Sequence, residues 1–544
     1  MFPAKPREEV LTDFRLYFQS MGIAKRGIVK NYGRRELRSL LWVLIAILLS
    51  RGVDAQEKGI QEKGSETARF AARVDTILAA NPVNKGEWGL LVVDAETGAT
   101  LYERNADDYF LPASNMKLLS TALALDTLGP DYRFHTTIET NGTLAADGKL
   151  TGDLILVGRG DPNLSNRRFP FDTKEEFDGP PERVLAEFAD AMVAKGVKEI
   201  SGDVVGDDSY FPRERYPDGW EIDDMVWEYG AAISAIVLND NTVTLALTPG
   251  QKAGEAVTME IEPATREFVV KNEVTTIGAR EKADLRLTRD PGSGTVIVSG
   301  VMPARGEPRK LTLAIQEPAL QAANQLMQLL KDRAIKVDGT PRAVHEPDPN
   351  EATRTVLAEH VSIPLKDSIK LVNKISQNLH TEVLLRTAAR QQGRWATPED
   401  LQKFPATFYA KAGIRDGDVI QTDGSGLSRH DLVTPRAFVA LLEYAQKQPW
   451  FPAYLASLPL AGQDGTLNER MKAPPLAGKI QAKTGSVTHV RALSGYAETP
   501  GGRKLIFSFL SNNQGGKNHE VHEAIDGLCL AMVEEFDEKR DVTK

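Results

Sequence analysis

The sequence predicts a mixed α/β (α+β) protein whose mainly β middle separates two regions that combine helices with strands. Residues from about 66 to 135 contain both helical and strand-like patterns. Short alternating runs separated by Gly, Pro and Asp turns dominate residues from about 136 to 350. Beyond residue 350 helical patterns return and are followed by three strand-like runs. No repeat of 20 to 50 residues accounts for the length of the chain.

The first region predicts a helix, a β-hairpin and a second helix, in that order. Apolar residues at helical spacing from Phe70 to Leu78 indicate the first helix, and the runs 88–93 and 100–104 flank a turn and form the hairpin. The Ala/Leu-rich stretch 116–128 follows Pro112-Ala113-Ser114 and ends at Gly129-Pro130. These flanking residues are typical start and stop signals of a helix.

The remaining elements follow from the same periodicities. The middle region predicts strands and one closing helix, at 242–247, 257–261, 295–298, 311–315 and 320–335. A Pro/Asp-rich stretch near residue 348 is typical of a linker. The last region predicts two helices, three strands and a final amphipathic helix, at 364–373, 376–391, 479–485, 491–497, 504–511 and 519–536.

Charge and cysteine content exclude several classes of protein. Residues 1–55 hold 10 basic and 5 acidic side chains, so the body after them has 56 basic and 70 acidic ones and a net charge of −14. An acidic body argues against nucleic acid as a partner. The single Cys529 cannot form an internal disulfide, and no Cys/His cluster has zinc spacing. We therefore expect the fold to depend on its core, without a disulfide or zinc staple. The chemistry that the motifs described below imply requires no metal and no cofactor.

The N-terminus predicts an export signal. Three arginines stand directly before the apolar run 40–49, which is too short to cross a bilayer as a helix. Val53-Asp54-Ala55 supplies the small residues of a signal-peptidase site, so we expect residues 1–55 to be a cleaved signal, 56–65 a polar spacer and the body periplasmic. The long stretch before the apolar run favours a translation start at Met21. An uncleaved membrane anchor is the alternative.

A serine and a lysine stand one turn apart at the start of the predicted helix 116–128. Ser114 is followed by Lys117, and residues three apart lie on the same face of a helix. A lysine desolvated inside a site can be neutral enough to take the proton of a serine hydroxyl. The helix N-terminus also favours negative charge that forms near Ser114. Taken alone, the pattern fits a capping serine and a solvated lysine as well.

Two further patterns strengthen the catalytic interpretation. Lys483-Thr484-Gly485 lies inside an apolar strand, where a lysine is costly unless it faces a cleft. There its ammonium and the threonine hydroxyl would bind a carboxylate, and the glycine would leave room for a peptide along the strand. Ser376-Gln377-Asn378 lies at the turn between two predicted helices. That pattern is weak by itself, because Ser511-Asn512-Asn513 matches it too.

The three patterns in this order resemble the signature of penicillin-binding proteins and serine β-lactamases. Ser114 and Ser376 are 262 residues apart, whereas a compact β-lactamase-like domain has only a short helical segment between them. A large insertion at this point resembles the D-alanyl-D-alanine carboxypeptidase/endopeptidase family of low-molecular-mass class C penicillin-binding proteins, peptidase family S13. The stretches Gly160-Asp161-Pro162 and Asp423-Gly424-Ser425-Gly426 fit that family. The resemblance covers residues 66–535.

This resemblance implies a nested architecture. A penicillin-binding core, with a five-stranded antiparallel sheet and helical cover, would be formed by 66–135 and 351–540. An inserted domain II would comprise 136–240 and 319–350, and a β-rich domain III, at 241–318, would be nested within it. The insertion would thus separate the first catalytic motif from the second.

The residues and the resemblance together imply a serine DD-peptidase mechanism. Ser114 would attack a D-Ala-D-Xaa bond while Lys117 accepts its proton, and Ser376 would relay a proton to the leaving amine. The substrate would be held by Asn378 at its amide backbone and by Lys483 and Thr484 at its terminal carboxylate, next to Gly485. The backbone N–H groups of Ser114 and Ser486 would form the oxyanion hole.

By resemblance the insertion also contributes a pocket for the free amino end of the stem peptide. The sequence Gly219-Trp220-Glu221-Ile222-Asp223-Asp224 makes Trp220 and either Asp223 or Asp224 the candidates. The expected partners are peptidoglycan stem peptides and cross-links, with β-lactams as covalent inhibitors and with peripheral membrane or homo-oligomer contact as a further expectation. Alternatives are a serine β-lactamase or an esterase on the same fold, and a non-catalytic wall-binding protein.

Overall fold

The computed structural model describes residues 65–169, 179–290 and 292–537. The predicted signal segment 1–55 and residues 56–64 of the predicted spacer lie outside the described residues. The chain from Phe70 onward forms one compact unit and is described here by itself. Within the described residues, no helix combines the length and the apolar character needed to cross a membrane.

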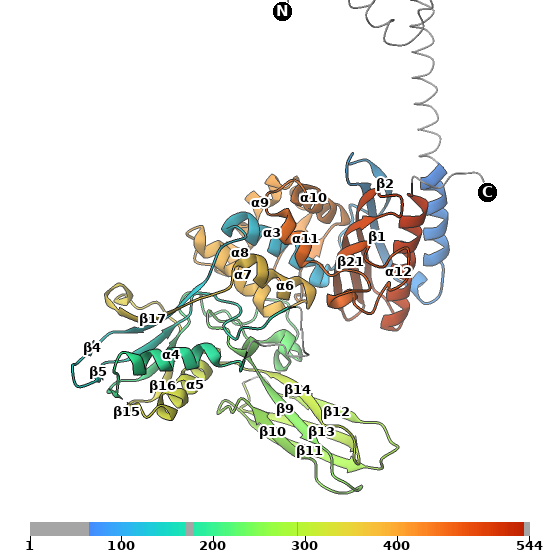
Figure 1. Cartoon of the computed structure of the whole chain (residues 1–544). Coiled ribbons are helices and arrows are strands. Elements are labelled where there is room, and N and C mark those ends of the chain that lie inside the picture. Colours follow the sequence, from blue (N-terminus) through green and yellow to red (C-terminus); the bar gives the residue numbers. More distant parts are fainter. Residues whose placement is uncertain (1–64, 170–178, 291, 538–544) are drawn as a thin grey trace, which may run out of the picture. The chain divides into compact units, whose positions relative to one another are not determined.

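A five-stranded antiparallel sheet joins the two ends of this unit. Its strand order is β2-β1-β22-β21-β20, so the first hairpin pairs with strands that lie about 400 residues later in the chain. Figure 1 shows the early strands in blue beside the late ones in red. The strands are β1 (Glu87–Asp94), β2 (Thr100–Arg104), β20 (Ile480–Val487), β21 (Val490–Glu498) and β22 (Lys504–Asn512).

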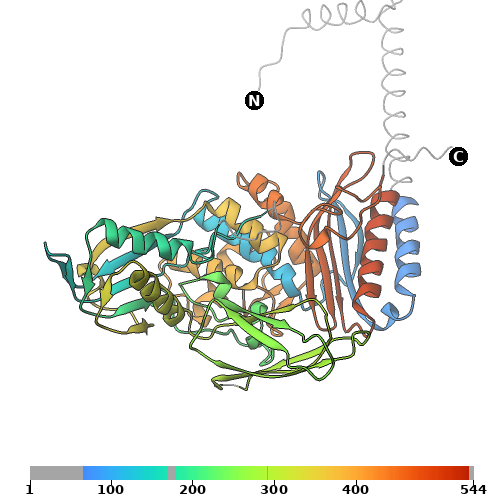
Figure 2. The ribbon, with the colours of Figure 1, turned by 60° about the horizontal axis from the view of Figure 1, so that its bottom comes forward.

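Alternation along the strands gives this sheet two apolar faces. Leu90 and Val92 of β1 pack under α12 (Asn518–Glu535) and the helix over 70–78, which lie side by side in Figure 2. Leu91 and Val93 point to the opposite face and pack against the helical part of the core. Side chains of a strand alternate between faces, and both faces of this sheet are covered. For that reason β1 is apolar and buried at nearly every position.

The helical part of the core is built around α3, which is buried along most of its length. Its bounds, Met116–Leu128, agree with the predicted helix. Its neighbours are η2 (Ala113–Asn115) and four helices that follow the outer part of the insertion, α6 (Leu365–Lys374), α7 (Asn378–Gln391), α10 (Pro435–Ala445) and α11 (Phe451–Ser457). The remaining elements of the core are η1 (Val83–Lys85), α8 (Pro398–Lys403), α9 (Ala406–Lys411), β18 (Val419–Ile420), β19 (Leu432–Val433) and η7 (Gly465–Leu467).

The outer part of the insertion is a mixed α/β layer. Two sheets, of order β16-β8-β6-β3-β17 and β15-β7-β5-β4, pack against α4 and α5. The elements are β3 (His135–Thr140), β4 (Thr143–Leu144), β5 (Lys149–Thr151), β6 (Leu154–Val157), α4 (Arg183–Ala194), β7 (Glu199–Ile200), β8 (Val204–Asp207), α5 (Pro318–Asp332), β15 (Lys336–Val337), β16 (Pro341–Val344), η6 (Glu351–Thr353) and β17 (Thr355–Val361).

Two features of this layer differ from the sequence-based expectation. Strand β17 lies beyond the predicted boundary at residue 350, yet it pairs antiparallel with β3, so it belongs to the sheet of the insertion rather than to the core. Helix α4 was not expected, although Val184, Leu185, Phe188 and Met192 recur at helical spacing and are buried. The expected helix near 320–335 is α5.

The inner part of the insertion consists of two three-stranded sheets that share one apolar core. Their orders are β10-β9-β14 and β11-β13-β12, and only the β11·β13 pair is parallel. All six strands fall within the predicted range 241–318. They are β9 (Thr242–Thr248), β10 (Thr258–Glu262), β11 (Val269–Ile277), β12 (Asp284–Thr288), β13 (Thr295–Pro303) and β14 (Arg309–Ala314).

Candidate active site

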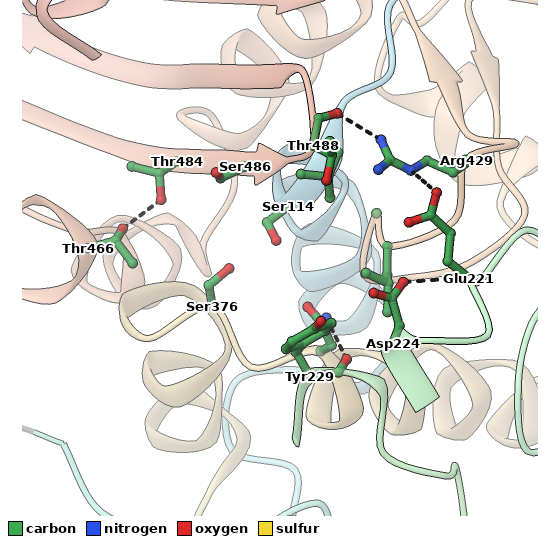
Figure 3. A pocket seen from close by; sticks show the side chains of 14 residues that line it. Ser114, Glu221, Asp224, Tyr229, Ser376, Arg429, Thr466, Thr484, Ser486 and Thr488 are labelled. Carbon is green, nitrogen blue, oxygen red and sulfur yellow. Dashed lines mark hydrogen bonds and ion pairs between the residues drawn. The ribbon is translucent and has the colours of Figure 1, made fainter. Parts of the chain in front are cut away.

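The three sequence motifs meet at one cavity of about 380 Å³. Figure 3 shows Ser114, Ser376 and Thr484 converging on it from different elements. Ser114 lies in η2, Ser376 in the turn between α6 and α7, and Thr484 on β20. The cavity is lined by Ser114, Glu221, Asp224, Tyr229, Ser376, Asn378, Gly426, Leu427, Arg429, Thr466, Thr484, Ser486, Val487 and Thr488.

Ser114 is held in place by the turn that contains it. The side chain of the neighbouring Asn115 is fully buried and donates to Ser494 Oγ of β21 at 2.7 Å, which fixes η2 against the sheet. Ala113, on the other side of Ser114, has a φ of 46°. Such left-handed backbone is costly for alanine and persists only where the surroundings impose it. The nucleophile therefore sits on a rigid and strained turn.

Two glycines let η2 fit between its neighbours. A Cβ on Gly485 would lie 2.7 Å from the carbonyl oxygen of Pro112, and one on Gly426 would lie 1.8 Å from that of Ala113. This corrects the expected role of Gly485, because the space beside it is filled by the protein's own backbone and not left for a peptide. The Lys-Thr-Gly glycine thus allows β20 to approach the nucleophile turn.

Lys117 lies beneath the cavity and contacts three oxygen atoms. Its Nζ is 2.9 Å from Ser114 Oγ, 2.6 Å from Asn378 Oδ1 and 2.7 Å from the carbonyl oxygen of Ser425. Burial lowers the pKa of Lys117 to about 7, although the charges of Asp423, Glu382 and Asp431 oppose the shift. The amine is therefore neutral in a large fraction of molecules near neutral pH, as a proton acceptor must be.

The neutral amine has a defined orientation. Asn378 Nδ2 donates to the carbonyl of Tyr229 at 2.8 Å, so its Oδ1 is the atom that faces Lys117. Asn378 Oδ1 and the Ser425 carbonyl can only accept hydrogen bonds, and a neutral amine has two N–H groups. Those two groups satisfy the two acceptors, and the lone pair is left toward Ser114 Oγ.

Lys483 forms a second serine–lysine pair. Its Nζ donates to Ser376 Oγ at 2.9 Å and to the carbonyl of Thr484 at 2.8 Å. Burial and the nearby charge of Lys117 hold its pKa well below the usual value. Ser376 has a φ of 64°, so its backbone is in the left-handed region. Lys483 does not line the cavity itself, whereas Ser376, Thr484 and Ser486 do.

The turn that carries Ser376 and Asn378 is fixed by the insertion. Buried Asp240, in η5 (Asn239–Asn241), accepts from Gln377 Nε2 at 2.9 Å and lies 2.9 Å from His380 Nε2. It also pairs with Arg167. Burial alone would raise the pKa of Asp240, but the charges of His380 and Arg167 outweigh it and lower the pKa. His380 therefore has a structural role, because it holds this carboxylate.

The structure separates the three insertion candidates. Trp220 is buried, with 7% of its surface exposed, and its Nε1 donates to Asp423 Oδ2 at 2.8 Å. It does not line the cavity, and neither does the exposed Asp223. Asp224 does, at the start of η3 (Asp224–Val226). The expectation that Trp220 lines the pocket is wrong: its indole is buried and donates to a buried carboxylate.

Several lining residues were missed from the sequence. Glu221 lies 3.5 Å from Arg429 Nε, and Arg429 also donates to the carbonyl of Thr488 at 3.1 Å. Thr466 of η7 is 2.7 Å from Thr484 Oγ1. Tyr229 belongs to η4 (Glu228–Gly230). These residues lie on loops and short turns, where no periodicity signals a shared site.

A serine at a helix start, a buried lysine beside it and a second serine–lysine pair define a hydrolase that works through an acyl-enzyme. The model of the D-Ala-D-Ala carboxypeptidase 3 (S13) family matches residues 70–532. The chain belongs to this family, as the three motifs predicted.

Individual relatives agree with the family match. The chain is 32% identical to the D-alanyl-D-alanine carboxypeptidase of Actinomadura sp. strain R39, over 88% of this chain and 87% of that protein. It is 28% identical to the D-alanyl-D-alanine carboxypeptidase DacB of Haemophilus influenzae, over 77% and 84%. The crystal structure of penicillin binding protein 4 from H. influenzae is similar, with a TM-score of 0.73, 25% identity and coverage of 85% of this chain and 99% of that one. This likeness confirms the predicted fold class.

Proposed function

We propose that the protein is a serine-type D-Ala-D-Ala carboxypeptidase that acts on peptidoglycan stem peptides through an acyl-enzyme on Ser114. The observation that carries the proposal is the contact of Ser114 Oγ with the buried amine of Lys117 at 2.9 Å. Family membership supports the reaction class. A relative that was crystallised in complex with a β-lactam supports β-lactams as ligands.

The proposed reaction uses the two serine–lysine pairs in sequence. Ser114 Oγ attacks the carbonyl carbon of the penultimate D-Ala while Lys117 takes the hydroxyl proton, and the backbone N–H groups of Ser114 and Ser486 face the developing oxyanion. The peptide C–N bond then breaks, and Ser376, beside Lys483, relays to the leaving amine the proton that Lys117 took. Water hydrolyses the ester, which restores the Ser114 hydroxyl. The same steps on a cross-link give endopeptidase action.

The terminal carboxylate of the substrate binds at β20 in this proposal. The hydroxyls of Thr484 and Thr466 lie 2.7 Å apart at the edge of the cavity, and the Lys483 ammonium lies directly behind Ser376. A carboxylate there would accept hydrogen bonds from the hydroxyls. Its negative charge would also stabilise the protonated form of Lys483, whose burial otherwise disfavours that form.

Asp224 is the proposed partner of a free ammonium at the end of the peptide side chain. Burial, together with the charges of Glu221 and Asp223, raises the pKa of Asp224, and a bound cation would relieve that repulsion. Glu221 is already paired with Arg429, so Asp224 is the better candidate. Of the two acids that the sequence left open, Asp224 rather than Asp223 is therefore the proposed partner of the ammonium.

The location of the protein is proposed from the sequence alone. The apolar run 40–49 after three arginines favours export, and N-terminal sequencing of the mature protein tests it. A mature chain that begins at Gln56 is expected, and one that keeps residues 40–49 would contradict cleavage. Peripheral membrane contact and self-association stay predictions, which cell fractionation and light scattering would test.

The deciding experiment is intact mass spectrometry of the protein with benzylpenicillin, beside the Ser114→Ala variant. A persistent mass gain of one penicillin is expected for the wild type and none for the variant. Release of D-Ala from a D-Ala-D-Ala peptide should be lost in the same variant. Rapid lactam turnover without an adduct would indicate a β-lactamase, and absence of both adduct and D-Ala release would overturn the proposal.

A further inference from the structure

One segment in the wall of the cavity is shaped by buried carboxylates, and its Gly426 and Leu427 line the cavity. Residues 422–428, here named the 422–428 loop, fold around the side chain of Asp423. This carboxylate accepts from the backbone N–H groups of Gly426, Leu427 and Ser428, at 2.6, 3.1 and 2.9 Å. Ser120 of α3 donates to the carbonyl of Gly424 at 2.7 Å and fastens the loop to the helix that carries Lys117.

A second carboxylate reaches the same loop from α7. Glu382 is fully buried, and its Oε1 accepts from the backbone N–H groups of Gly424 and Ser425, both at 2.8 Å. Its Oε2 accepts from Arg386 Nη1 at 2.8 Å. Every hydrogen bond of this carboxylate is thus made to buried protein groups. A buried carboxylate with this many partners fixes the backbone that it holds.

The backbone held by Glu382 is the one that orients Lys117. The Ser425 carbonyl accepts from Lys117 Nζ at 2.7 Å, so it is one of the two acceptors that leave the amine lone pair toward Ser114. Moving this carbonyl would release one N–H group of the amine. The lone pair would then have no fixed direction, and proton transfer from Ser114 would slow.

We propose that Glu382 is a positioning residue for the acylation step: it fixes the Ser425 carbonyl against Lys117. Its buried carboxylate also belongs to the group of acids whose charges act on the Lys117 amine. The inference rests on the proposed function, because it assumes that Lys117 takes the proton of Ser114. It concerns no contact with the substrate, since Glu382 does not line the cavity.

The charges around Lys117 decide the sign of the effect. Asp423 from the loop, Glu382 from α7 and Asp431, just before β19, raise the pKa of Lys117 against the effect of burial. Lys483 on β20 faces Lys117 as a like charge. Burial and the charge of Asp423 raise the pKa of Glu382 to about 7, although the charge of Arg386 opposes this shift. Glu382 is therefore charged in the alkaline part of the pH range around 7. Removing the charge of Glu382 must lower the pKa of Lys117, so that the amine stays neutral at lower pH.

The test is the pH dependence of the rate of Ser114 acylation by benzylpenicillin, followed by intact mass. For the wild type the rate should rise with pH through about 7, as Lys117 loses its proton. Glu382→Gln keeps the size of the side chain and removes the charge. The acid limb of its pH profile, over which the acylation rate rises with pH, should shift to lower pH by about one unit. A limb that stays at the wild-type pH would overturn the electrostatic part of the inference.

Asp431→Asn is the matched control. Burial and the charge of Asp423 raise the pKa of Asp431 well above the usual value, and of the three acids around Lys117 it has the smallest effect on the pKa of that amine. Asparagine has the shape of a neutral aspartic acid and should shift the acid limb clearly less than Glu382→Gln does. A shift as large as that of Glu382→Gln would show that any change in this buried cluster moves the limb, and would refute the specific role of Glu382.

Glu382→Asp separates positioning from charge. It keeps the carboxylate but shortens the side chain, so the bonds to Gly424 and Ser425 lengthen. The limb should stay at the wild-type pH while the plateau rate falls about tenfold, and a wild-type plateau would refute positioning. This variant also decides the case if Glu382→Gln does not fold. If the wild type forms no adduct at any pH, the proposed function fails together with the inference. If the wild type forms the adduct and both Glu382 variants match its rate and its pH profile, the inference alone fails.

Discussion

The two ends of the cavity are built in different ways. At the nucleophile end Ser114, Lys117 and Asn378 come from η2, α3 and α7, and the groups behind them are buried. At the insertion end Glu221, Asp224 and Arg429 come from loops and a 3₁₀ turn, and they are exposed or half-buried (Figure 3). Burial strengthens electrostatic effects, whereas exposed charges are screened by solvent. We therefore expect substitutions at the nucleophile end to change the rate of acylation and those at the insertion end to change substrate selection.

The largest effect is expected at the centre of the nucleophile end. Lys117→Met keeps the length of the side chain and removes the amine, so Ser114 loses its proton acceptor. The rate of acylation by benzylpenicillin should fall roughly a thousandfold. Intact mass spectrometry over time measures it, and circular dichroism checks the fold. A folded variant that acylates within tenfold of the wild type would contradict the role of Lys117.

The next largest effect is expected where β20 touches η2. In Gly485→Ala the new methyl group would meet the Pro112 carbonyl oxygen at 2.7 Å, so η2 or β20 must move. The free energy of unfolding should fall by about 1 to 3 kcal/mol, and acylation should slow at least about tenfold. Urea unfolding and adduct formation measure the two. Gly294→Ala is the control, because nothing lies within 4 Å of its added Cβ.

At the insertion end the comparison predicts a change in selection without a change in acylation. Asp224→Asn should raise the Michaelis constant about tenfold for a D-Ala-D-Ala peptide with a free side-chain ammonium. The acetylated peptide and benzylpenicillin should react as with the wild type. Asp223→Asn is the comparison variant: the Asp223 carboxylate lies within 4.8 Å of that of Asp224 but does not line the cavity, so this variant should raise the Michaelis constant clearly less than Asp224→Asn does. Equal losses for all three substrates would refute the ammonium site.

The smallest effect is expected at the junction between the two ends. Trp220→Phe keeps most of the buried ring and removes the hydrogen bond to Asp423 Oδ2. The free energy of unfolding should fall by about 1 kcal/mol, with acylation changed less than threefold. Urea unfolding measures the stability change, and adduct formation measures acylation; together they distinguish a structural role of Trp220 from a role in substrate binding. A rise in the Michaelis constant only for the ammonium peptide would restore Trp220 to the substrate pocket.

Local sequence patterns were enough for the elements of the core. The start signal at Pro112-Ala113-Ser114 and the stop at Gly129-Pro130 predicted the helix that is α3, because capping and chain reversal depend on adjacent residues. Strands β20 to β22 and α12 followed from alternation and helical spacing in the same way. The motif order also indicated that Ser114, Ser376 and Lys483 belong together, although no local pattern shows how far apart they lie in space.

Only the tertiary structure decided which loop residues meet at the cavity. The sequence offered Trp220 together with either Asp223 or Asp224, but the packing of the insertion against the 422–428 loop buries the tryptophan, and of these three residues only Asp224 lines the cavity. Glu382 reads as one charged residue on a helix, and its hydrogen bonds to Gly424 and Ser425 cross about 40 residues of chain. The physical reason is that backbone periodicity is set by neighbours in sequence, whereas the burial and pairing of a polar side chain depend on segments brought together by the whole fold.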